Sequence, residues 1–363
     1  MSMDLILPAV ISLLITILAI PVTIIFAKKF NLLDNPEVRP HPAHIQKRIV
    51  PRAGGLAIFS GIILATTIFI PVEKTTLGIF IGLSILLLVG LLDDKYHNLS
   101  PYQRLIGQFI AAAVAVGSGI GIKFITNPLG GIIHLDTTIT QLNLLGISHT
   151  ILLADILALV WIVWVMNMIN WSKGVDGQMP GIVAIAALIL GLLSLKLNLS
   201  PDLTQVNLAK LAFITAGAAG GFLIFNWHPA KIFPGFSGST ILGFMIAILA
   251  ILSGGKLATA GLVLLIPATD FAYTFFRRIL QGKSPVWGDK EHLHHKLLEK
   301  GFSHQRISLF YILGSVILGA AALSLSSSGK LFAAALIGTI ILGGILWLNF
   351  FGALSKQRAP DNG

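Results

Sequence analysis

The sequence predicts an all-α membrane protein whose chain crosses the bilayer about eleven times, and three observations support this. Hydrophobic residues make up 55% of the 363 residues and charged residues only 11%, whereas an ordinary soluble domain carries about 25% charged residues. The apolar residues form runs of roughly 18 to 23, long enough for a helix to cross the ~30 Å hydrocarbon core. Polar residues gather between these runs, so they mark the loops.

Each apolar run between polar breaks is expected to be one membrane helix. The first run is long, begins with the acidic residue Asp4 and lacks a clear small-residue cleavage site, so we interpret it as a membrane helix and not as a signal peptide. The expected helices cover residues 5–27, 54–72, 75–92, 105–125, 150–170, 181–197, 207–227, 239–255, 257–279, 306–325 and 331–351.

The basic residues predict the orientation of the chain. Of the 25 Lys and Arg residues, 19 lie in segments that follow odd-numbered helices, and six lie on the other side. The positive-inside rule therefore predicts an outer N-terminus and a cytoplasmic C-terminus. The longest outer segment, 126–149, has β-branched residues in loose alternation around Gly and Asn, which predicts a short outer β-hairpin.

Composition excludes several classes of protein. The chain has no Cys, which excludes disulfide scaffolds, thiolate metal sites and Cys nucleophiles. The net charge of +10 lies mainly on one membrane face, so we expect no nucleic-acid partner. We find no separate soluble domain, low-complexity tract or internal repeat, and residues 1–363 are expected to form a single domain.

Nearly all residues capable of chemistry lie in five segments of the predicted inner face, and eight of the ten His residues also lie on that face, with only His134 and His149 on the other. One active site assembled from several loops explains this better than five unrelated sites do. The segments are 34–55, 91–108, 167–181, 226–240 and 277–301.

Two carboxylates, Asp93 and Asp94, stand where the third expected helix meets water. Adjacent carboxylates on an electropositive face can share a Mg²⁺ ion, or one can accept a proton while the other fixes the geometry. The alternative is a solvated pair that ends a helix. Asp270 lies within the ninth expected helix, and an unpaired carboxylate there is costly, so we expect it to have a partner or a function.

The amide and glycine residues of two loops predict ligand contacts. Asn167, Asn170 and Asp176 follow the fifth expected helix, and such side chains coordinate hard cations or contact polar ligands, although they also serve tight turns. Gly235 and Ser239 stand at the start of the eighth expected helix, where free backbone N–H groups favour the binding of an anion.

Imidazoles and guanidinium groups supply the remaining candidates. His292, His294 and His295 could bind a transition metal, phosphate oxygens or a nucleotide, and their spacing does not match the i, i+4 pattern of helical zinc sites. Arg52 and Arg104 supply charge for phosphates or for anionic lipid headgroups.

In this order, the motifs resemble those of the polyprenyl-phosphate N-acetylhexosamine-1-phosphate transferases, a superfamily that includes the phospho-MurNAc-pentapeptide translocase and the GlcNAc-1-phosphate transferases. The resemblance spans roughly residues 34–301, and the eleven-helix topology agrees with it. The matching motifs are PRAGG at 51–55, LLDD with LSPYQRLIGQ at 91–108, NxxN with GVDG at 167–177, HPAKIFPGFSGS at 228–239, PxxD at 267–270 and HLHH at 292–295.

The resemblance implies an enzyme of the bacterial plasma membrane. In the implied reaction, a polyprenyl phosphate such as undecaprenyl phosphate attacks the β-phosphate of a UDP-N-acetylhexosamine, releases UMP and leaves a lipid-linked sugar pyrophosphate. This is the first membrane step in making peptidoglycan, lipopolysaccharide or teichoic acid. The implied cofactor is Mg²⁺ or Mn²⁺, and the sequence leaves open whether the protein is a homodimer.

The resemblance also implies roles for individual residues. Asp93, Asp94 and Asp176 are the expected catalytic residues, and Asn170 joins Asp93 and Asp94 as an expected metal ligand. The expected substrate-binding residues are Arg52, Arg104, Asn167, Lys173, Gly235, Ser239, His292, His294 and His295.

Two positions depart from the family pattern. Phe236 stands where the family motif FxGDxGS has a metal-binding Asp. Lys173 replaces the first Asp of the family motif DGxDG. Three interpretations stay open: the remaining ligands hold the metal more weakly, Lys173 supplies the charge of the metal, or the chain is a catalytically impaired relative that binds polyprenyl phosphate or a nucleotide sugar. A lipid or solute transporter is less favoured, because the polar residues lie at one face and not at the midplane.

Overall fold

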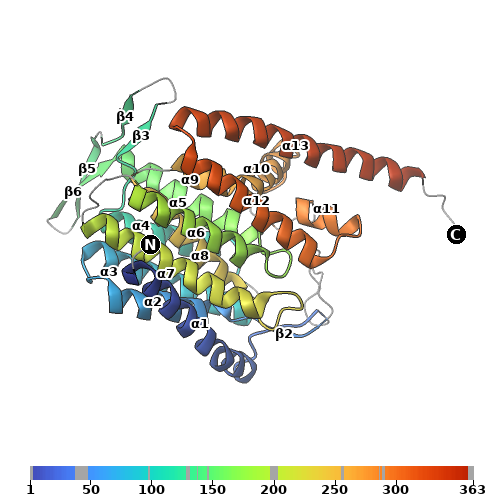
Figure 1. The fold of residues 1–363 in the computed structure, drawn as a ribbon, viewed down its shortest axis with the longest axis horizontal. Helices are drawn as coiled ribbons and strands as arrows, with labels where there is room; N and C mark the ends of the chain where they lie inside the picture. The colour runs from blue at the N-terminus through green and yellow to red at the C-terminus, as the bar shows by residue number, and fades with distance from the viewer. Residues whose placement is uncertain are drawn as a thin grey trace.

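The structure is a computed structural model that describes residues 3–36, 48–96, 99–127, 131–136, 138–144, 147–196, 203–254, 257–285, 287 and 291–358. These residues form thirteen helices and three small two-stranded sheets (Figure 1). The helices are α1 Met3–Lys29, α2 Gly54–Phe69, α3 Lys74–Tyr96, α4 Pro101–Gly117, α5 Leu153–Trp171, α6 Gln178–Lys196, α7 Leu203–Asn226, α8 Gly235–Leu252, α9 Leu257–Val263, α10 Leu265–Leu280, α11 Leu293–Glu299, α12 His304–Ser324 and α13 Ser327–Arg358.

Most of these helices have the length and composition of membrane spans. Eight helices pass that test within the described residues, namely α1, α3, α5, α6, α7, α8, α12 and α13. The helices α9 and α10 pass it together, although the chain bends by 88° between them. The chain is therefore a multi-pass membrane protein of the all-α class, as the sequence predicts.

Two expectations about helix extent are wrong. The expected span 257–279 is divided into α9 and α10, and Pro267 in the first turn of α10 has no N–H to donate back to α9, which favours a new helix start. The expected span 105–125 ends early, because α4 stops at Gly117 and Gly119 has a φ of +108°, which suits a helix end.

The segment around 126–149 forms two antiparallel pairs where one hairpin was expected. Strand β3 (Phe124–Thr126) pairs with β4 (Ile132–His134), and β5 (Thr138–Leu144) pairs with β6 (Ile147–Leu152). Both pairs lie at one end of the helix bundle, and α11 and β2 (Val50–Pro51) lie toward the other end (Figure 1).

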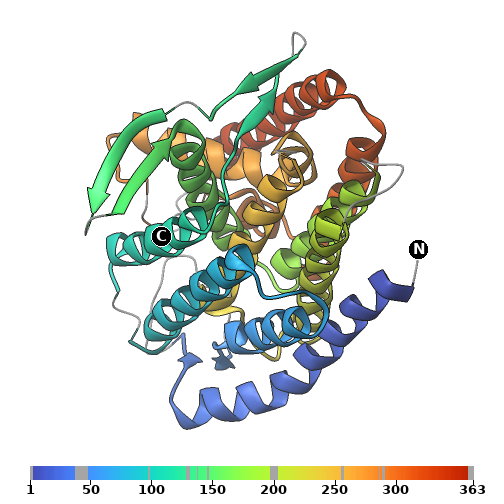
Figure 2. The ribbon, with the colours of Figure 1, turned by 90° about the vertical axis from the view of Figure 1, so that its left-hand side faces the viewer.

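Helix α8 forms the centre of the bundle. Its residues 235–251 are all buried, which is the pattern of a helix that is apolar on every side. Helices α2, α3 and α5 pack against it, and Figure 2 shows it enclosed by other helices when the bundle is viewed along its length. Helix α8 begins at Gly235, and its buried N-terminal end gives the loops of the candidate site a rigid element to pack against.

A two-residue strand pair adds a further segment to this end of the bundle. Strand β1 (Leu33–Asp34) pairs with β2 in the register Leu33↔Pro51 and Asp34↔Val50. The sequence patterns do not predict this pairing, which places Asp34 beside Arg52. The ends of α3 and α5 and the start of α8 reach the same region.

Candidate functional site

Five charged residues, of which the three carboxylates are buried and the two arginines partly buried, form a network that we call the aspartate–arginine cluster: Asp34, Arg52, Asp93, Asp94 and Arg104. Arg52 contacts all three carboxylates, with Nε 2.9 Å from Asp94 Oδ1, Nη1 3.7 Å from Asp34 Oδ1 and Nη2 3.9 Å from Asp93 Oδ2. Arg104 Nε lies 2.9 Å from Asp93 Oδ1. The cluster brings four predicted residues together with Asp34, which lies in the segment 34–55 and has no predicted role.

Asp94 is engaged in holding the start of α8. Its carboxylate accepts hydrogen bonds from Arg52 Nε at 2.9 Å, from Phe236 N–H at 2.8 Å, and from the hydroxyl and N–H of Ser237 at 2.8 and 3.4 Å. A Cβ atom at Gly235, where φ is +69°, would collide with this carboxylate. These contacts make Asp94 an N-terminal cap of α8 and leave it few lone pairs to accept a proton.

Asp93 has the same chemistry in a different setting. It is fully buried, and its charge faces Arg104 and Arg52. Neither of its oxygens receives a hydrogen bond from the described residues, because the 2.9 Å approach of Arg104 Nε has the geometry of an ion pair and not of a hydrogen bond. Asp93 therefore has lone pairs available for a proton or for the hydroxyl group of a ligand.

Lys173 lies in the turn between α5 and α6, and its ammonium group is surrounded by oxygens. Its Nζ is 2.6 Å from Asn170 Oδ1, 3.1 Å from the carbonyl oxygen of Gly235 and 3.4 Å from Ser239 Oγ. Ser239 Oγ also lies 2.8 Å from Asn170 Oδ1. Three oxygen neighbours match the three N–H groups of an ammonium.

Phe236 lies beside this ammonium group. Its buried ring has Arg104 Cζ 5.6 Å and Lys173 Nζ 6.0 Å from its centroid, within the range of cation–π interactions. The two residues that depart from the family pattern are therefore neighbours in space. Burial, with Arg52 nearby, lowers the pKa of Lys173 to about 7, while Asp94 and Asp93 act to raise it.

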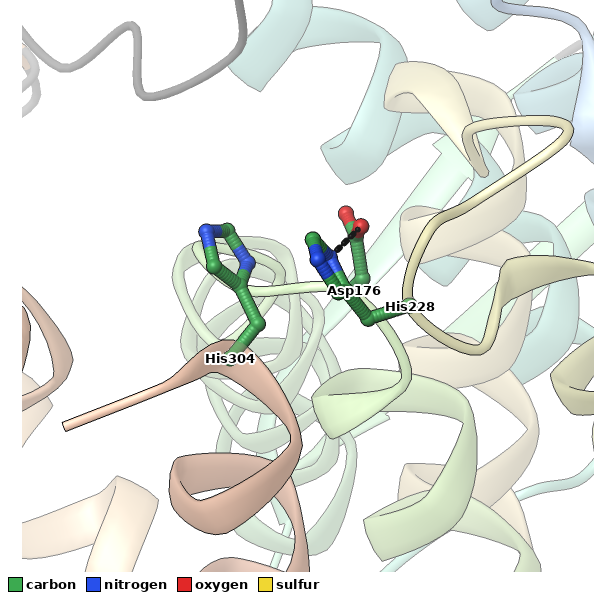
Figure 3. Close-up of side chains that lie close together, drawn as sticks. All are labelled: Asp176, His228 and His304. Atoms are coloured by element: carbon green, nitrogen blue, oxygen red, sulfur yellow. Dashed lines mark hydrogen bonds and ion pairs between the residues drawn. The ribbon is translucent and has the colours of Figure 1, made fainter.

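A second group joins Asp176 to two histidines (Figure 3). Asp176 Oδ2 lies 2.7 Å from His228 Nδ1 and accepts the N–H of Ala230 at 3.1 Å. The ring of His304 stacks on that of His228, with centroids 4.5 Å apart and 20° between the planes. One ligand atom from each of the three residues lies within 4.8 Å of the others, but parallel rings do not aim their in-plane lone pairs at one ion. The geometry fits a hydrogen-bonded Asp–His pair better than a metal centre.

Neither histidine of this group is a sequence candidate. His228 stands in the HPAK motif, which is the signal that could have identified it, whereas His304 follows the last motif segment. The contact forms because the turn before α6 and the loop before α8 meet the start of α12.

The histidine segment, residues 292–295, docks onto the turn between α5 and α6 that contains Lys173. His292 Nδ1 lies 3.0 Å from Asp270 Oδ2, and Leu293 N–H donates to Asp270 Oδ1 at 2.8 Å, so the expected partner of Asp270 is confirmed. His294 is buried, and a Cβ atom at Gly174 would collide with its Nε2. The structure therefore uses His292 and His294 to position this segment.

His294 is held in its neutral form. Burial lowers its pKa well below the usual range, and the neighbouring imidazoles of His295, His292 and His304 act in the same direction. Its Nδ1 has no hydrogen-bond partner among the described residues.

Asn167 is used in packing between helices. Its Nδ2 donates to Gln108 Oε1 and to the carbonyl oxygen of Val163, each at 2.8 Å. The pair joins α4 to α5 next to the cluster.

Comparison of the sequence with known proteins places this chain in a family. Residues 76–254 match the model described as glycosyl transferase family 4. The chain is 31% identical over 318 residues to a probable undecaprenyl-phosphate N-acetylglucosaminyl 1-phosphate transferase of Bacillus subtilis, covering 85% of this chain and 81% of that protein. This chain belongs to glycosyl transferase family 4. It is accordingly a membrane-embedded transferase enzyme.

Other relatives span two branches of this glycosyl transferase family. A decaprenyl-phosphate N-acetylglucosaminephosphotransferase of Mycobacterium tuberculosis is 30% identical over 343 residues, covering 85% of this chain and 80% of that protein. A phospho-N-acetylmuramoyl-pentapeptide-transferase of Moorella thermoacetica is 28% identical over 334 residues, covering 88% and 97%.

Transferases of this type are generally dependent on a divalent metal, but the residues of this member do not fit one at the expected place. Asn170 Oδ1 is engaged by Lys173 and Ser239. Asp94 is engaged by the start of α8, and Phe236 offers no ligand atom from its side chain. Of the expected ligands, only Asp93 has oxygens that receive no hydrogen bond from the described residues, and its charge faces Arg52 and Arg104. Mg²⁺ requires a near-octahedral shell of oxygens, usually with carboxylates, and one carboxylate paired with two arginines does not supply it.

Proposed function

We propose that this enzyme transfers an N-acetylhexosamine 1-phosphate from a UDP-sugar to a polyprenyl phosphate and releases UMP. Two of its relatives are named as transferases of N-acetylglucosamine phosphate to undecaprenyl phosphate and decaprenyl phosphate, which supports a polyprenyl phosphate as the acceptor and an N-acetylhexosamine as the sugar. The observation that carries the proposal is Asp93, a buried carboxylate between two arginines whose oxygens receive no hydrogen bond from the described residues.

The proposed chemistry follows from this setting. The lipid phosphate binds beside Arg104, whose side chain is 26% exposed, and beside Arg52. Asp93 takes the proton from the phosphate hydroxyl, and the freed oxygen attacks the β-phosphorus of the UDP-sugar. The bond from this phosphorus to the oxygen that bridges the two phosphates breaks, and UMP leaves with that oxygen. The arginines offset the negative charge that develops.

The other predicted residues divide between binding and positioning. We assign Asp176 and His228 to contacts with the nucleotide, since His228 is partly exposed and Asp176 orients its ring. Asp94, Asn167, His292 and His294 act as positioning residues through the contacts described above. Mg²⁺ is not part of the proposal, because Lys173 lies against Asn170 Oδ1, one of the oxygens expected to bind it.

We further propose that the chain is one functional unit in a bacterial plasma membrane, with the N-terminus outside and the C-terminus in the cytoplasm. The excess of basic residues around the cluster supports this orientation. A cytoplasmic cluster meets both a water-soluble nucleotide sugar and a lipid phosphate.

The test is UMP release by the purified chain in detergent with undecaprenyl phosphate and a panel of UDP-N-acetylhexosamines. We expect release with at least one sugar, and Asp93→Asn should lower the rate about 10²- to 10⁴-fold, the usual contribution of a general base. Asp136→Asn is the matched control, because Asp136 is exposed and lies next to β4 at the far end of the bundle. No UMP release with any sugar, or full activity of Asp93→Asn, would contradict the proposal. Movement of lipid or solute across vesicles without UMP release would indicate a transporter instead.

A further inference from the structure

We infer that Lys173 is a built-in cation, which supplies at this site the positive charge that related transferases take from a divalent metal, so that this chain binds its nucleoside diphosphate substrate without a metal. The inference deepens the proposed function and rests on it for the identity of the substrate. Three properties of the site carry it: the oxygen neighbours, the balance of charge and the position of Phe236.

The oxygen neighbours suit an ammonium group and not a divalent ion. Asn170, Gly235 and Ser239 offer a carboxamide, a backbone carbonyl and a hydroxyl oxygen at 2.6, 3.1 and 3.4 Å from Lys173 Nζ. All three are neutral groups, whereas sites for Mg²⁺ normally include a carboxylate. A metal ion would have to displace a covalently attached cation and then bind oxygens that carry no charge.

The charges of the site balance without a metal. The cluster carries the carboxylates of Asp34, Asp93 and Asp94 and the guanidinium groups of Arg52 and Arg104, which leaves one negative charge. The ammonium group of Lys173 neutralises it when the side chain is protonated. Without substrate, a divalent ion added to this neutral group would leave two uncompensated positive charges, which is costly in a low dielectric.

Phe236 explains how the ammonium keeps its place. The cations of Arg104 and Lys173 both lie near this ring, at 5.6 and 6.0 Å from its centroid. A carboxylate at position 236 would compete with Asn170 for the N–H groups of Lys173, whereas an aromatic face attracts both cations without accepting a strong hydrogen bond. The two departures from the family pattern therefore act as a pair.

The longest of the three oxygen contacts shows how a ligand can engage the ammonium. Ser239 Oγ is 3.4 Å from Lys173 Nζ and has other neighbours in the carbonyl oxygens of Gly235 and Phe236, at 2.9 and 3.1 Å. A phosphate oxygen can replace this contact while Asn170 and Gly235 continue to hold the side chain. Lys173 then donates one charge-assisted hydrogen bond to the diphosphate.

The first experiment measures metal binding and does not depend on activity. Mn²⁺ is titrated into the purified chain in detergent, and free Mn²⁺ is followed by electron paramagnetic resonance. We expect no stoichiometric site in the native chain and a gain of at least tenfold in Mn²⁺ affinity in Lys173→Asp/Phe236→Asp. Lys231→Asp is the control, because it makes the same change of charge at an exposed lysine on the same face. A stoichiometric Mn²⁺ site in the native chain that Asn170→Ala removes would overturn the inference.

The second experiment measures binding of UDP-GlcNAc by calorimetry in the presence of EDTA. We expect the native dissociation constant to change less than twofold when Mg²⁺ replaces EDTA, Lys173→Gln to weaken binding at least tenfold, and Lys173→Arg to restore part of the loss. Size-exclusion profiles show whether each variant is folded.

The two ways of failing are distinguishable. Binding or UMP release that requires Mg²⁺ would overturn the built-in cation and leave the proposed transfer reaction intact. If no UDP-sugar binds under any condition and the Mn²⁺ results are as expected, the proposed function is contradicted. The inference that the site binds no divalent metal would remain.

Discussion

The aspartate–arginine cluster and the histidine segment lie at the same end of the molecule but use charge in opposite ways. In the cluster, three buried carboxylates and two partly buried guanidinium groups compensate one another, with Arg52 in contact with all three carboxylates. In the histidine segment, the carboxylate of Asp270 is engaged by one imidazole and one backbone N–H, and His294 is neutral. The first region is suited to binding phosphate and moving a proton, and the second to holding a loop in place.

The comparison is sharpest within the cluster itself, between two adjacent residues. Asp94 receives four hydrogen bonds and Asp93 none among the described residues. Identical side chains therefore divide into a structural and a reactive carboxylate, because only one of them meets the start of α8.

The largest expected effect on stability comes from Asp94→Asn. The amide would turn an NH₂ group toward N–H donors of α8 and leave Arg52 without its closest partner, and breaking a buried charged network in this way costs about 3–5 kcal/mol. Thermal unfolding in detergent should show a larger loss for Asp94→Asn than for Asp93→Asn, which weakens ion pairs with Arg104 and Arg52 but removes no hydrogen bond from the described residues. Equal losses would remove the distinction between the two carboxylates.

A smaller effect is expected where the histidine segment is anchored. Asp270→Asn weakens the contacts to His292 and Leu293, and loss of such buried hydrogen bonds costs about 1–3 kcal/mol. Hydrogen exchange should increase in residues 291–299 and not in α8. Exchange that increases throughout the bundle would show that Asp270 supports the fold as a whole.

Docking of the two loops is tested by Gly174→Ala. The added methyl group collides with His294, so we expect a raised KM for the nucleotide sugar, by about tenfold if the loop shift costs roughly 1.4 kcal/mol. Gly117→Ala is the control, because a Cβ atom there has no neighbour within 4 Å. An unchanged KM would mean that contact between these loops does not shape the site.

The smallest effect is a dependence of stability on pH. The pKa of His294 is lowered in the folded state by burial and by His295, His292 and His304, so the unfolded state binds the proton first. The stability that depends on neutral His294 is therefore present above about pH 6.5 and is lost as the pH falls, with a slope of at most about 1.4 kcal/mol per pH unit. Melting curves between pH 8 and pH 5 should show this slope, and His294→Asn should reduce it.

The sequence predicts the membrane class, most helices and four of the five cluster residues, because apolar runs and motif order are local properties. The contact between Lys173 and Phe236 is not predictable in this way, since it depends on how α5 packs against α8. The same holds for Asp34, whose approach to Arg52 depends on a strand pair of two residues on each side. The broken span at α9 and α10 was missed because hydropathy does not report the direction of a helix.

The start of α8 has a consequence for how the reaction centre responds to its ligands. Asp94, Phe236 and Ser239 all belong to or contact the first turns of the most deeply buried helix, so they have little freedom to move. A centre built on such an element is preorganised: it meets the substrate in its working geometry and spends little binding energy on rearrangement. Adaptation to different lipids and sugars is then left to the surrounding loops.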